Sequence, residues 1–279
     1  MGEPFPAWIV IDDSGERFAA DAAMKGTMPA TPSASSTCVL RLEKDSCYMA
    51  RPVCESATGD VLVTATLHYI HDPLCGWCYG AEPLVRAAAD VAELALVLHA
   101  GGLWPQPTTL PPEMRRYIQQ ADTRIAQMSG QPFGQAYLSG SLLDATLVLH
   151  SRPTIAAVLA AQTLDPGKAL PMLRGIQHAH YEQGQRVVER EVLCDIAEAC
   201  GLSRAEFAAA LDTVAVDAHI AATRELMGRV GSGGFPTFVL QIGETLVGVP
   251  HQRFASSPAE FQAWLRRQIA AQARAAATH

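Results

Sequence analysis

The sequence predicts an α/β protein whose core consists of a β-α-β unit and a later β-β-α unit, with a large all-α insertion between them. Three features predict this order. A strand, a helix and a second strand follow one another from residue 61, helical patterns then fill residues 111–230, and two short strands and a helix close the chain. We therefore expect a core of residues 61–110 and 231–279, a helical insertion of residues 111–230, and a poorly ordered extension of residues 1–60.

The first half of the predicted core contains two strands and one helix. Residues 61–70 are rich in Val, Thr and Leu, which favours a strand. Residues 77–92 carry apolar side chains at helical spacing, and a second apolar strand over residues 93–100 ends at two glycines. This succession indicates a right-handed unit with parallel strands.

The predicted insertion is a series of helices. The first begins with Pro-Pro-Glu, a frequent helix start, and a later one begins with the capping box Ser203-x-x-Glu206. Pro171 is tolerated only if it lies in the first turn of its helix. The expected helices cover residues 111–128, 141–150, 153–163, 167–184, 189–200, 203–211 and 214–230.

The second half of the predicted core begins after a glycine-rich loop at residues 231–234. A strand is expected over residues 235–240, where Pro236 stands at the strand's start and its missing N–H is tolerated. A tight turn at residues 241–244 leads to a returning strand over residues 245–249. A helix over residues 257–276 completes the core.

Composition and charge argue against two classes of function. The chain has 21 Lys and Arg against 28 Asp and Glu, a formal charge of −7, whereas nucleic-acid binding usually depends on a basic patch. No apolar run is long enough to predict a membrane span. Hydrophobic residues make up 49% of the chain, which is sufficient for a well-buried core.

The first 60 residues differ from the rest. Residues 26–37 are rich in Pro and Ser and have no period, which predicts loop or disorder. The N-terminus lacks the basic and apolar regions of a secretory signal, so we expect a cytoplasmic protein. In that compartment most thiols stay reduced, and a reactive cysteine pair is more often catalytic than structural.

The sequence Cys75-Gly76-Trp77-Cys78 carries the predicted chemistry. It follows a strand and a short polar turn and opens a helix. Unpaired N–H groups and the helix dipole stabilise a thiolate there, and the thiolate is the nucleophile of thiol chemistry. Cys75 is the candidate attacking thiol and Cys78 the resolving thiol. Gly76 and Trp77 are expected to tune the reduction potential, and Trp77 either contacts substrate at the rim or packs against the helix.

A zinc site is the alternative interpretation of this cysteine pair. Zinc usually needs two more ligands, often from a second Cys-x-x-Cys, which the chain lacks. We therefore expect a redox pair and no metal. In the insertion, His178, His180 and Tyr181 predict a solvated polar face, with a lining of the active-site groove as the alternative.

Two motifs together resemble the DsbA family of the thioredoxin-like superfamily, in particular its signal-less bacterial branch. They are Asp72-Pro-Leu-Cys75-Gly-Trp-Cys78 and Gly234-Phe-Pro236-Thr-Phe, with the helical insertion between them. The resemblance covers about residues 62–277. It implies a thioredoxin-like fold in which Pro236 is cis and lies against the dithiol, and Phe235 and Thr237 border a substrate groove.

The resemblance implies a thiol–disulfide oxidoreductase that needs no cofactor, with protein thiols and disulfides or glutathione as partners. The Gly-Trp dipeptide differs from the Pro-His of the periplasmic oxidants, which argues against a strong oxidant. Two alternatives stay open. One is a glutathione-dependent isomerase or transferase of the hydroxychromene carboxylate isomerase or kappa type, and the other is a non-catalytic adaptor for proteolysis. The sequence leaves open the substrate, the direction of electron flow and the oligomeric state.

Overall fold

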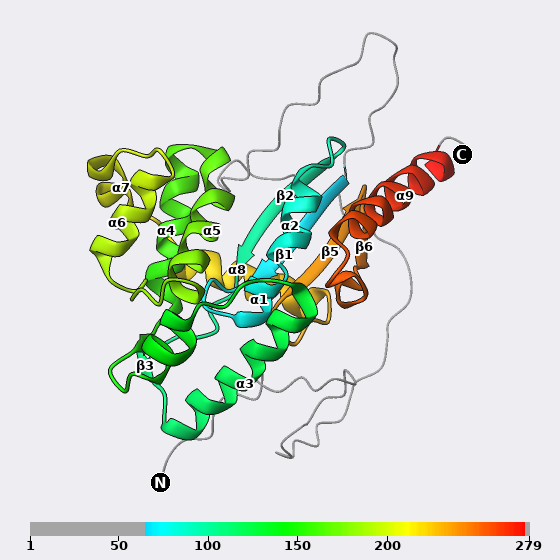
Figure 1. The fold of residues 1–279 in the computed structure, drawn as a ribbon. Helices are drawn as coiled ribbons and strands as arrows, with labels where there is room; N and C mark the ends of the chain where they lie inside the picture. The colour runs from blue at the N-terminus through cyan, green and yellow to red at the C-terminus, as the bar shows by residue number, and fades with distance from the viewer. Residues whose placement is uncertain (1–64, 277–279) are drawn as a thin grey trace, which may run out of the picture. The chain divides into compact units, whose positions relative to one another are not determined.

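The computed structural model describes residues 65–276, and the extension expected at residues 1–60 lies outside this range. The centre of the described part is a four-stranded sheet with the strand order β2-β1-β5-β6 (Figure 1). Strand β1 is parallel to β2 and antiparallel to β5, and β5 is antiparallel to β6. The strands are β1 (Ala65–His71), β2 (Leu94–Ala100), β5 (Thr237–Ile242) and β6 (Thr245–Gly248). The predicted β-α-β and β-β-α units are thus joined in one sheet, which confirms the predicted fold class.

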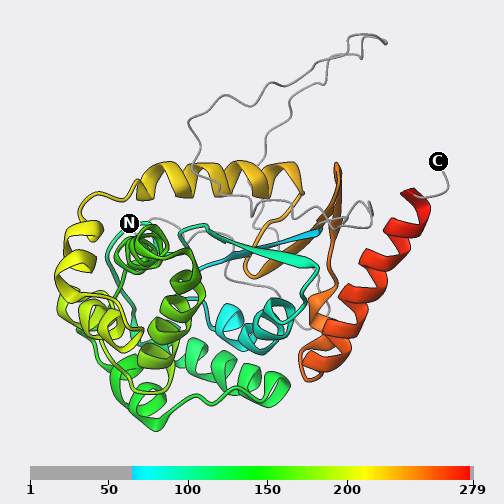
Figure 2. The same cartoon turned by 90° about the horizontal axis from the view of Figure 1, so that it is seen from above.

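Helices cover both faces of this sheet. Helices α1 (Gly76–Gly80) and α2 (Glu82–Ala89) lie on one face, and α8 (Val216–Arg229) lies across the other (Figure 2). The C-terminal helix α9 (Pro258–Ala276) packs beside α2. On this side of the sheet the ring of Phe238 lies between those of Tyr69 and Phe261, with centroid distances of 4.7 and 5.8 Å. These side chains belong to the apolar core that supports α1.

The helix expected over residues 77–92 is two helices. Helix α1 ends at Gly80, and α2 starts at Glu82 with Pro83 in its first turn. Proline is suited to a first turn because it has no N–H to donate and its φ is already helical. The prediction of one continuous helix missed this break.

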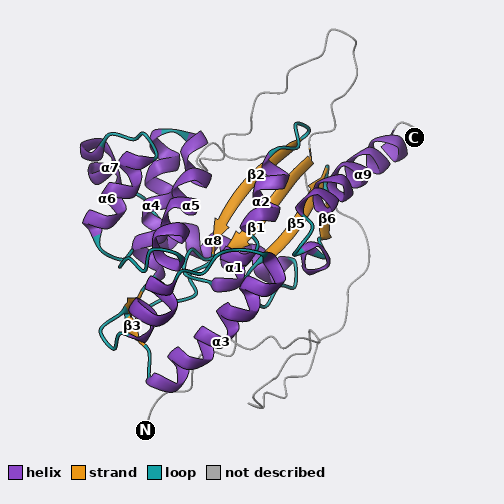
Figure 3. Ribbon diagram, in the orientation of Figure 1, coloured by secondary structure: helices purple, strands orange, loops and turns teal. Residues whose placement is uncertain are grey.

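The helices between the two halves of the core follow the expected order (Figure 3). Pro171 lies in the first turn of its helix, as required, and Ser203 accepts a hydrogen bond from the Glu206 N–H, as predicted for a capping box. The helices are α3 (Pro112–Ser129), α4 (Ser151–Leu164), α5 (Ala169–Tyr181), α6 (Arg190–Ala199) and α7 (Arg204–Leu211).

The prediction of a helix over residues 141–150 is wrong. A π-helical turn (Ala136–Gly140) and a 3-10 turn (Ser141–Leu143) come first, and Val148–Leu149 then forms strand β4, paired with β3 (Thr108–Thr109). The carboxylate of Asp144 accepts a hydrogen bond of 2.8 Å from the Thr146 N–H. Such a side-chain bond offers the backbone a turn in place of a helix.

Helix α8 belongs spatially to the sheet, although the predicted boundary at residue 230 assigns it to the insertion. It packs against β2, and the N–H of Ala100 donates to His219 Nε2 over 3.0 Å. The expected domain limits remain a prediction.

Candidate active site

The two cysteines lie at the start of α1, where the sequence predicts them. Cys75 precedes the helix in an extended conformation, and its carbonyl accepts hydrogen bonds from the N–H groups of Cys78 and Tyr79. Both thiols are free. Cys75 is 7% exposed and Cys78 is fully buried. The more accessible cysteine is therefore Cys75, which carries the candidate attacking thiol.

The Cys78 thiol is enclosed by the loop that precedes Cys75. Its sulfur accepts a hydrogen bond of 3.5 Å from the N–H of Asp72. Burial raises the pKa of Cys78 well above that of an ordinary thiol, the neighbouring Cys75 raises it further, and the hydrogen bond from the Asp72 N–H opposes the shift. Cys78 is thus held in its protonated form, as suits a thiol that reacts second.

The loop before β5 contacts Cys75 across 160 residues of sequence. The Phe235 carbonyl lies 3.9 Å from Cys75 Sγ, and the Phe235–Pro236 peptide bond is cis. The Thr237 hydroxyl is 2.9 Å from the Gly234 carbonyl oxygen. The structure therefore brings the Phe235 carbonyl to Cys75. The two residues that follow in the chain, Pro236 and Thr237, are half-buried.

Arg224 on α8 fixes this loop to the end of β2. Its guanidinium donates to the carbonyls of Gly101 (2.5 Å) and Gly102 (2.6 Å) and lies over the ring of Phe235, 5.5 Å from the centroid. A Cβ atom on Gly101 would overlap that ring, so this position has no room for a side chain. Arg224 is not among the residues that the sequence predicts for the site. Nothing in the sequence around an arginine on an amphipathic helix indicates that it lies near the cysteines.

Asp72 shapes the turn in front of Cys75. Its buried carboxylate accepts hydrogen bonds from the N–H groups of Leu74 (2.9 Å) and Leu103 (2.7 Å). Burial raises the pKa of Asp72, and these two bonds oppose the shift. The sequence contained a signal here, since an Asp-Pro pair after a strand marks a turn.

The two residues between the cysteines lie in different surroundings. A Cβ atom on Gly76 would overlap Oδ1 of Asp122, and Ile125 Cδ1 would be 3.4 Å away; both belong to α3. Trp77 is 36% exposed. This exposure favours the substrate-contact interpretation of Trp77 over simple helix packing.

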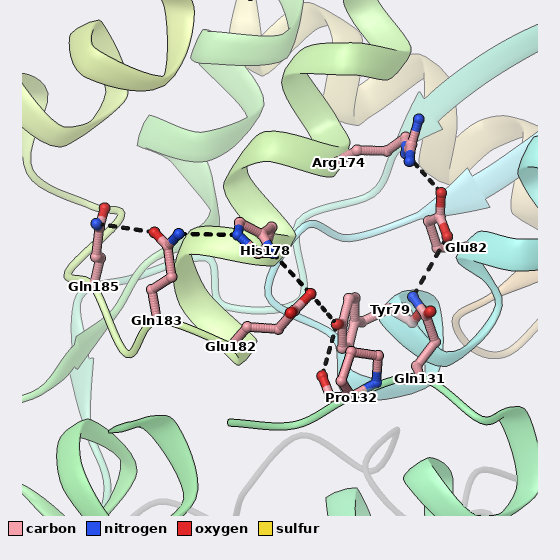
Figure 4. Close-up of polar contacts among 9 residues, drawn as sticks. All are labelled: Tyr79, Glu82, Gln131, Pro132, Arg174, His178, Glu182, Gln183 and Gln185. Carbon is pink, nitrogen blue, oxygen red and sulfur yellow. Dashed lines mark hydrogen bonds and ion pairs between the residues drawn. The ribbon is translucent and has the colours of Figure 1, made fainter. Parts of the chain in front are cut away.

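A chain of polar contacts joins α1 and α2 to the inserted helices (Figure 4). The hydroxyl of Tyr79 lies 2.8 Å from Glu182 Oε1 and 2.7 Å from the carbonyl oxygen of Pro132. Arg174 on α5 forms an ion pair of 2.6 Å with Glu82 on α2. The dithiol helix α1 is therefore bonded to Glu182, the residue that follows α5, and to the loop after α3, and α2 is bonded to α5.

Aromatic packing strengthens the same junction. The rings of Tyr79 and Tyr181 are stacked at 4.8 Å, and Tyr137 contacts Tyr181 edge-on at 5.2 Å. His180 and Tyr181 are buried, which corrects the prediction of a solvated face, and only His178 of that patch is exposed. The helical period is as predicted, but the face that turns inward depends on where α5 meets α1.

Metal-binding clusters and membrane-spanning helices are both absent from the described residues. These residues contain no group of three or more His, Cys, Asp or Glu side chains arranged to hold a metal ion. None of the helices within residues 65–276 combines the length and apolar character needed to cross a membrane.

Comparison with known families and sequences gave one family match. The model of a family described as a DSBA-like thioredoxin domain matches residues 66–257. The comparison with curated proteins found no relative.

Solved structures similar to this chain include the cytosolic disulfide reductase DsbM from Pseudomonas aeruginosa. It is 45% identical, with a TM-score of 0.69, over 73% of this chain and 98% of that chain. The same protein with GSH is 44% identical, with a TM-score of 0.67 over the same shares. A protein from Nitrosomonas europaea at 23% identity (TM-score 0.64, 75% of this chain and 98% of that chain) supports the fold alone.

Proposed function

Because this chain belongs to the DSBA-like thioredoxin domain family, we propose that it is a cytosolic thiol–disulfide oxidoreductase that acts through Cys75 and Cys78. We further propose that it works as a reductase, with glutathione as the source of electrons. The observation that carries the proposal is the position of the dithiol. Cys75 opens α1 with its sulfur 3.9 Å from the Phe235 carbonyl, and the buried Cys78 lies one turn along the helix. The similarity to DsbM supports the direction, the compartment and the choice of glutathione.

Two exchange steps transfer electrons to the substrate. The Cys75 thiolate attacks one sulfur of a substrate disulfide, a Cys75–substrate bond forms, and the leaving sulfur takes a proton from water. Cys78 then loses its proton and attacks the Cys75 sulfur, which releases the second substrate thiol. The substrate gains two electrons and two protons, and Cys75 and Cys78 become a disulfide.

Two glutathione molecules regenerate the dithiol. The thiolate of the first attacks the Cys75 sulfur, which frees Cys78 as a thiol and leaves glutathione bound to Cys75. The thiolate of the second attacks the glutathione sulfur, which frees Cys75 and releases oxidised glutathione. The reduced protein then begins another cycle.

In this proposal the residues around the dithiol have separate roles. Gly76 and Trp77 tune the potential, and Trp77 offers an exposed ring to the substrate. Phe235, Pro236 and Thr237 border the groove. An extended polypeptide adds there through backbone hydrogen bonds, as in other complexes that extend a sheet or loop edge.

A redox titration against glutathione tests the proposal. Tryptophan fluorescence would follow the transition, and alkylation with mass spectrometry would identify the cysteines that titrate. We expect one two-electron transition at Cys75 and Cys78, with a midpoint nearer to about −270 mV, typical of a reductant, than to about −120 mV, typical of an oxidant. Cys78→Ser should retain one glutathionyl group on Cys75, whereas Cys200→Ser should titrate like the wild type.

Other outcomes would redirect the assignment. A protein with no dithiol transition and reactivity at Cys75 alone would contradict the oxidoreductase and favour the isomerase or transferase. A double Cys75→Ser and Cys78→Ser variant that keeps its full cellular role would favour the adaptor.

A further inference from the structure

A carboxylate from the helical insertion lies against the backbone between the two cysteines. Asp122 on α3 is only 3% exposed. Its Oδ1 occupies the space that a Cβ atom on Gly76 would need, and its carboxyl carbon would be 3.3 Å from that atom. The carboxyl group therefore contacts Gly76, one of the two residues between Cys75 and Cys78.

The orientation of this carboxyl group is fixed by Tyr137. The Tyr137 hydroxyl donates a hydrogen bond of 2.8 Å to Asp122 Oδ2. Tyr137 is 2% exposed and packs on Tyr181, which in turn stacks on Tyr79 of α1. Asp122 is thus held between the aromatic junction and the dithiol motif.

Asp122 is ionisable in the physiological range. Burial raises its pKa to about 7, and the hydrogen bond from Tyr137 opposes that shift. The titratable groups around Asp122 come from three elements. Tyr137 on the π-helical turn donates to it, and His180 on α5 contacts the ring of Tyr137. Tyr181 on α5 responds to the charges of both Asp122 and the cysteines that flank the Gly76-Trp77 pair at the start of α1.

Those neighbours do not offset its charge near neutral pH. Burial lowers the pKa of His180 to about 4, so this imidazole is neutral at pH 7. After burial itself, the charges of Tyr137, Asp122, Cys75 and Cys78 each raise the pKa of the Tyr181 hydroxyl. Asp122 and the dithiol therefore act on the same buried group.

We propose that Asp122 is a positioning residue that makes the dithiol more reducing, because its negative charge opposes a thiolate at the Cys75–Cys78 pair. The inference rests on the proposed redox function and adds a residue of the insertion to it. An ionised Asp122 destabilises the reduced, thiolate form relative to the disulfide, which lowers the reduction potential. A protonated Asp122 has no such effect.

The variant Asp122→Asn separates charge from shape, because it keeps the size of the side chain and an oxygen for Tyr137. At pH 8 we expect Cys75 to be alkylated by iodoacetamide about tenfold faster in this variant than in the wild type, because a nearby negative charge disfavours the thiolate. At pH 5.5 the two rates should agree, because Asp122 is then neutral in the wild type. Peptide mapping by mass spectrometry distinguishes Cys75 from the other cysteines.

The glutathione titration gives a second measurement. If the thiolate form is favoured tenfold, the equilibrium constant changes tenfold and the midpoint at pH 8 rises by about 30 mV. The exposed Asp90→Asn serves as the control and should change neither value. Tyr137→Phe provides an independent variant, since loss of its hydrogen bond should raise the pKa of Asp122 and move the inflection in the alkylation rate to higher pH.

The outcomes separate this inference from the proposed function. If the wild type shows no two-electron transition at Cys75 and Cys78, the proposed function fails and this inference with it. If that transition is present but Asp122→Asn folds and keeps the wild-type pH profile and midpoint, only the inference is overturned. If Asp122→Asn does not fold, an unchanged inflection in Tyr137→Phe overturns it.

Discussion

Gly76 occupies a position where the structure leaves no space for a side chain. Its neighbours there are Asp122 and Ile125, both buried on α3. Packing of this density resists even one additional methyl group, because the surrounding atoms have no room to move aside. The small residue between the cysteines is therefore explained by a helix that begins 36 residues later, at Pro112.

The substitution Gly76→Ala should destabilise the protein by roughly 1–3 kcal/mol, the usual cost of overpacking. Urea unfolding measures this free energy. Gly233→Ala is a matched control, since a Cβ atom there meets nothing within 4 Å. Equal stability of the two variants would contradict this prediction and show that α3 moves aside to accept the added methyl group.

Asp122 should also make the free energy of unfolding depend on pH. Its pKa is about 7 in the folded protein, against 3.8 for an unperturbed aspartate, so the unfolded chain releases this proton first. This carboxyl group therefore reduces stability progressively as the pH rises from 3.8 to about 7, by roughly 2–4 kcal/mol in total. Asp122→Asn should be more stable than the wild type at pH 8, and the gain should shrink towards pH 4. A gain that is constant with pH in urea unfolding would contradict this sign.

At the scale of elements, the dithiol helix is held by the insertion as well as by the sheet. Tyr69 under the helix donates a hydrogen bond of 3.0 Å to the Cys78 carbonyl. Two groups of the insertion, the Glu182 carboxylate and the Pro132 carbonyl, lie within hydrogen-bond distance of the Tyr79 hydroxyl. Helix α1 has only five residues, so these contacts replace the stability that a longer helix would have on its own.

The substitution Tyr79→Phe should cost about 0.5–1.5 kcal/mol of stability, because it removes the hydrogen bonds of this hydroxyl to Glu182 and the Pro132 carbonyl. Urea unfolding of Tyr117→Phe provides the control, since Tyr117 lies on α3 and is 43% exposed. We also expect faster alkylation of Cys78 in Tyr79→Phe, as the helix opens more often. Identical stability and alkylation in both variants would rule out this role for the Tyr79 hydroxyl.

For the whole molecule, buried histidines set the response to acid. Burial lowers the pKa of His71 and His99 to about 3 and that of His180 and His251 to about 4. These residues lie on β1, β2, α5 and the 3-10 turn before α9, so they are distributed over the sheet and the helical parts of the fold. The folded protein keeps them neutral, whereas the unfolded chain binds protons near pH 6.5.

Stability should therefore fall as the pH drops below 6.5, and it should continue to fall until the folded pKa values of 3–4 are reached. Each of the four histidines contributes roughly 1.4 kcal/mol per pH unit in that window. Asp122 and Asp72, whose pKa values burial raises, act in the opposite sense, but they are fewer than the histidines. Urea unfolding at pH 7.5, 6 and 5 measures the sum, and His251→Gln should weaken the dependence by about one proton. A stability that stays constant from pH 7.5 to 5 would contradict this account.

The sequence alone determined the order of the elements, the fold class and the position of the dithiol. These depend on local physics: apolar periodicity, turn residues such as the Asp72-Pro73 pair, and two cysteines at the start of a helix. Even the cis geometry expected for Pro236 came from a short motif and its resemblance to a family. The errors at residues 77–92 and 141–150 were local too, since Pro83 and the Asp144 turn compete with helix formation.

The tertiary structure alone decided which distant groups meet at the dithiol. Asp122, Arg224 and Tyr181 lie on helices whose patterns predict an inward face but not the neighbour on the other side. That neighbour depends on how α3, α5 and α8 pack around α1 and the sheet, and packing of this kind joins residues separated by 46 to over 100 positions. The electrostatics of the site follow from these contacts, because burial and nearby charge shift a pKa only after the chain has folded.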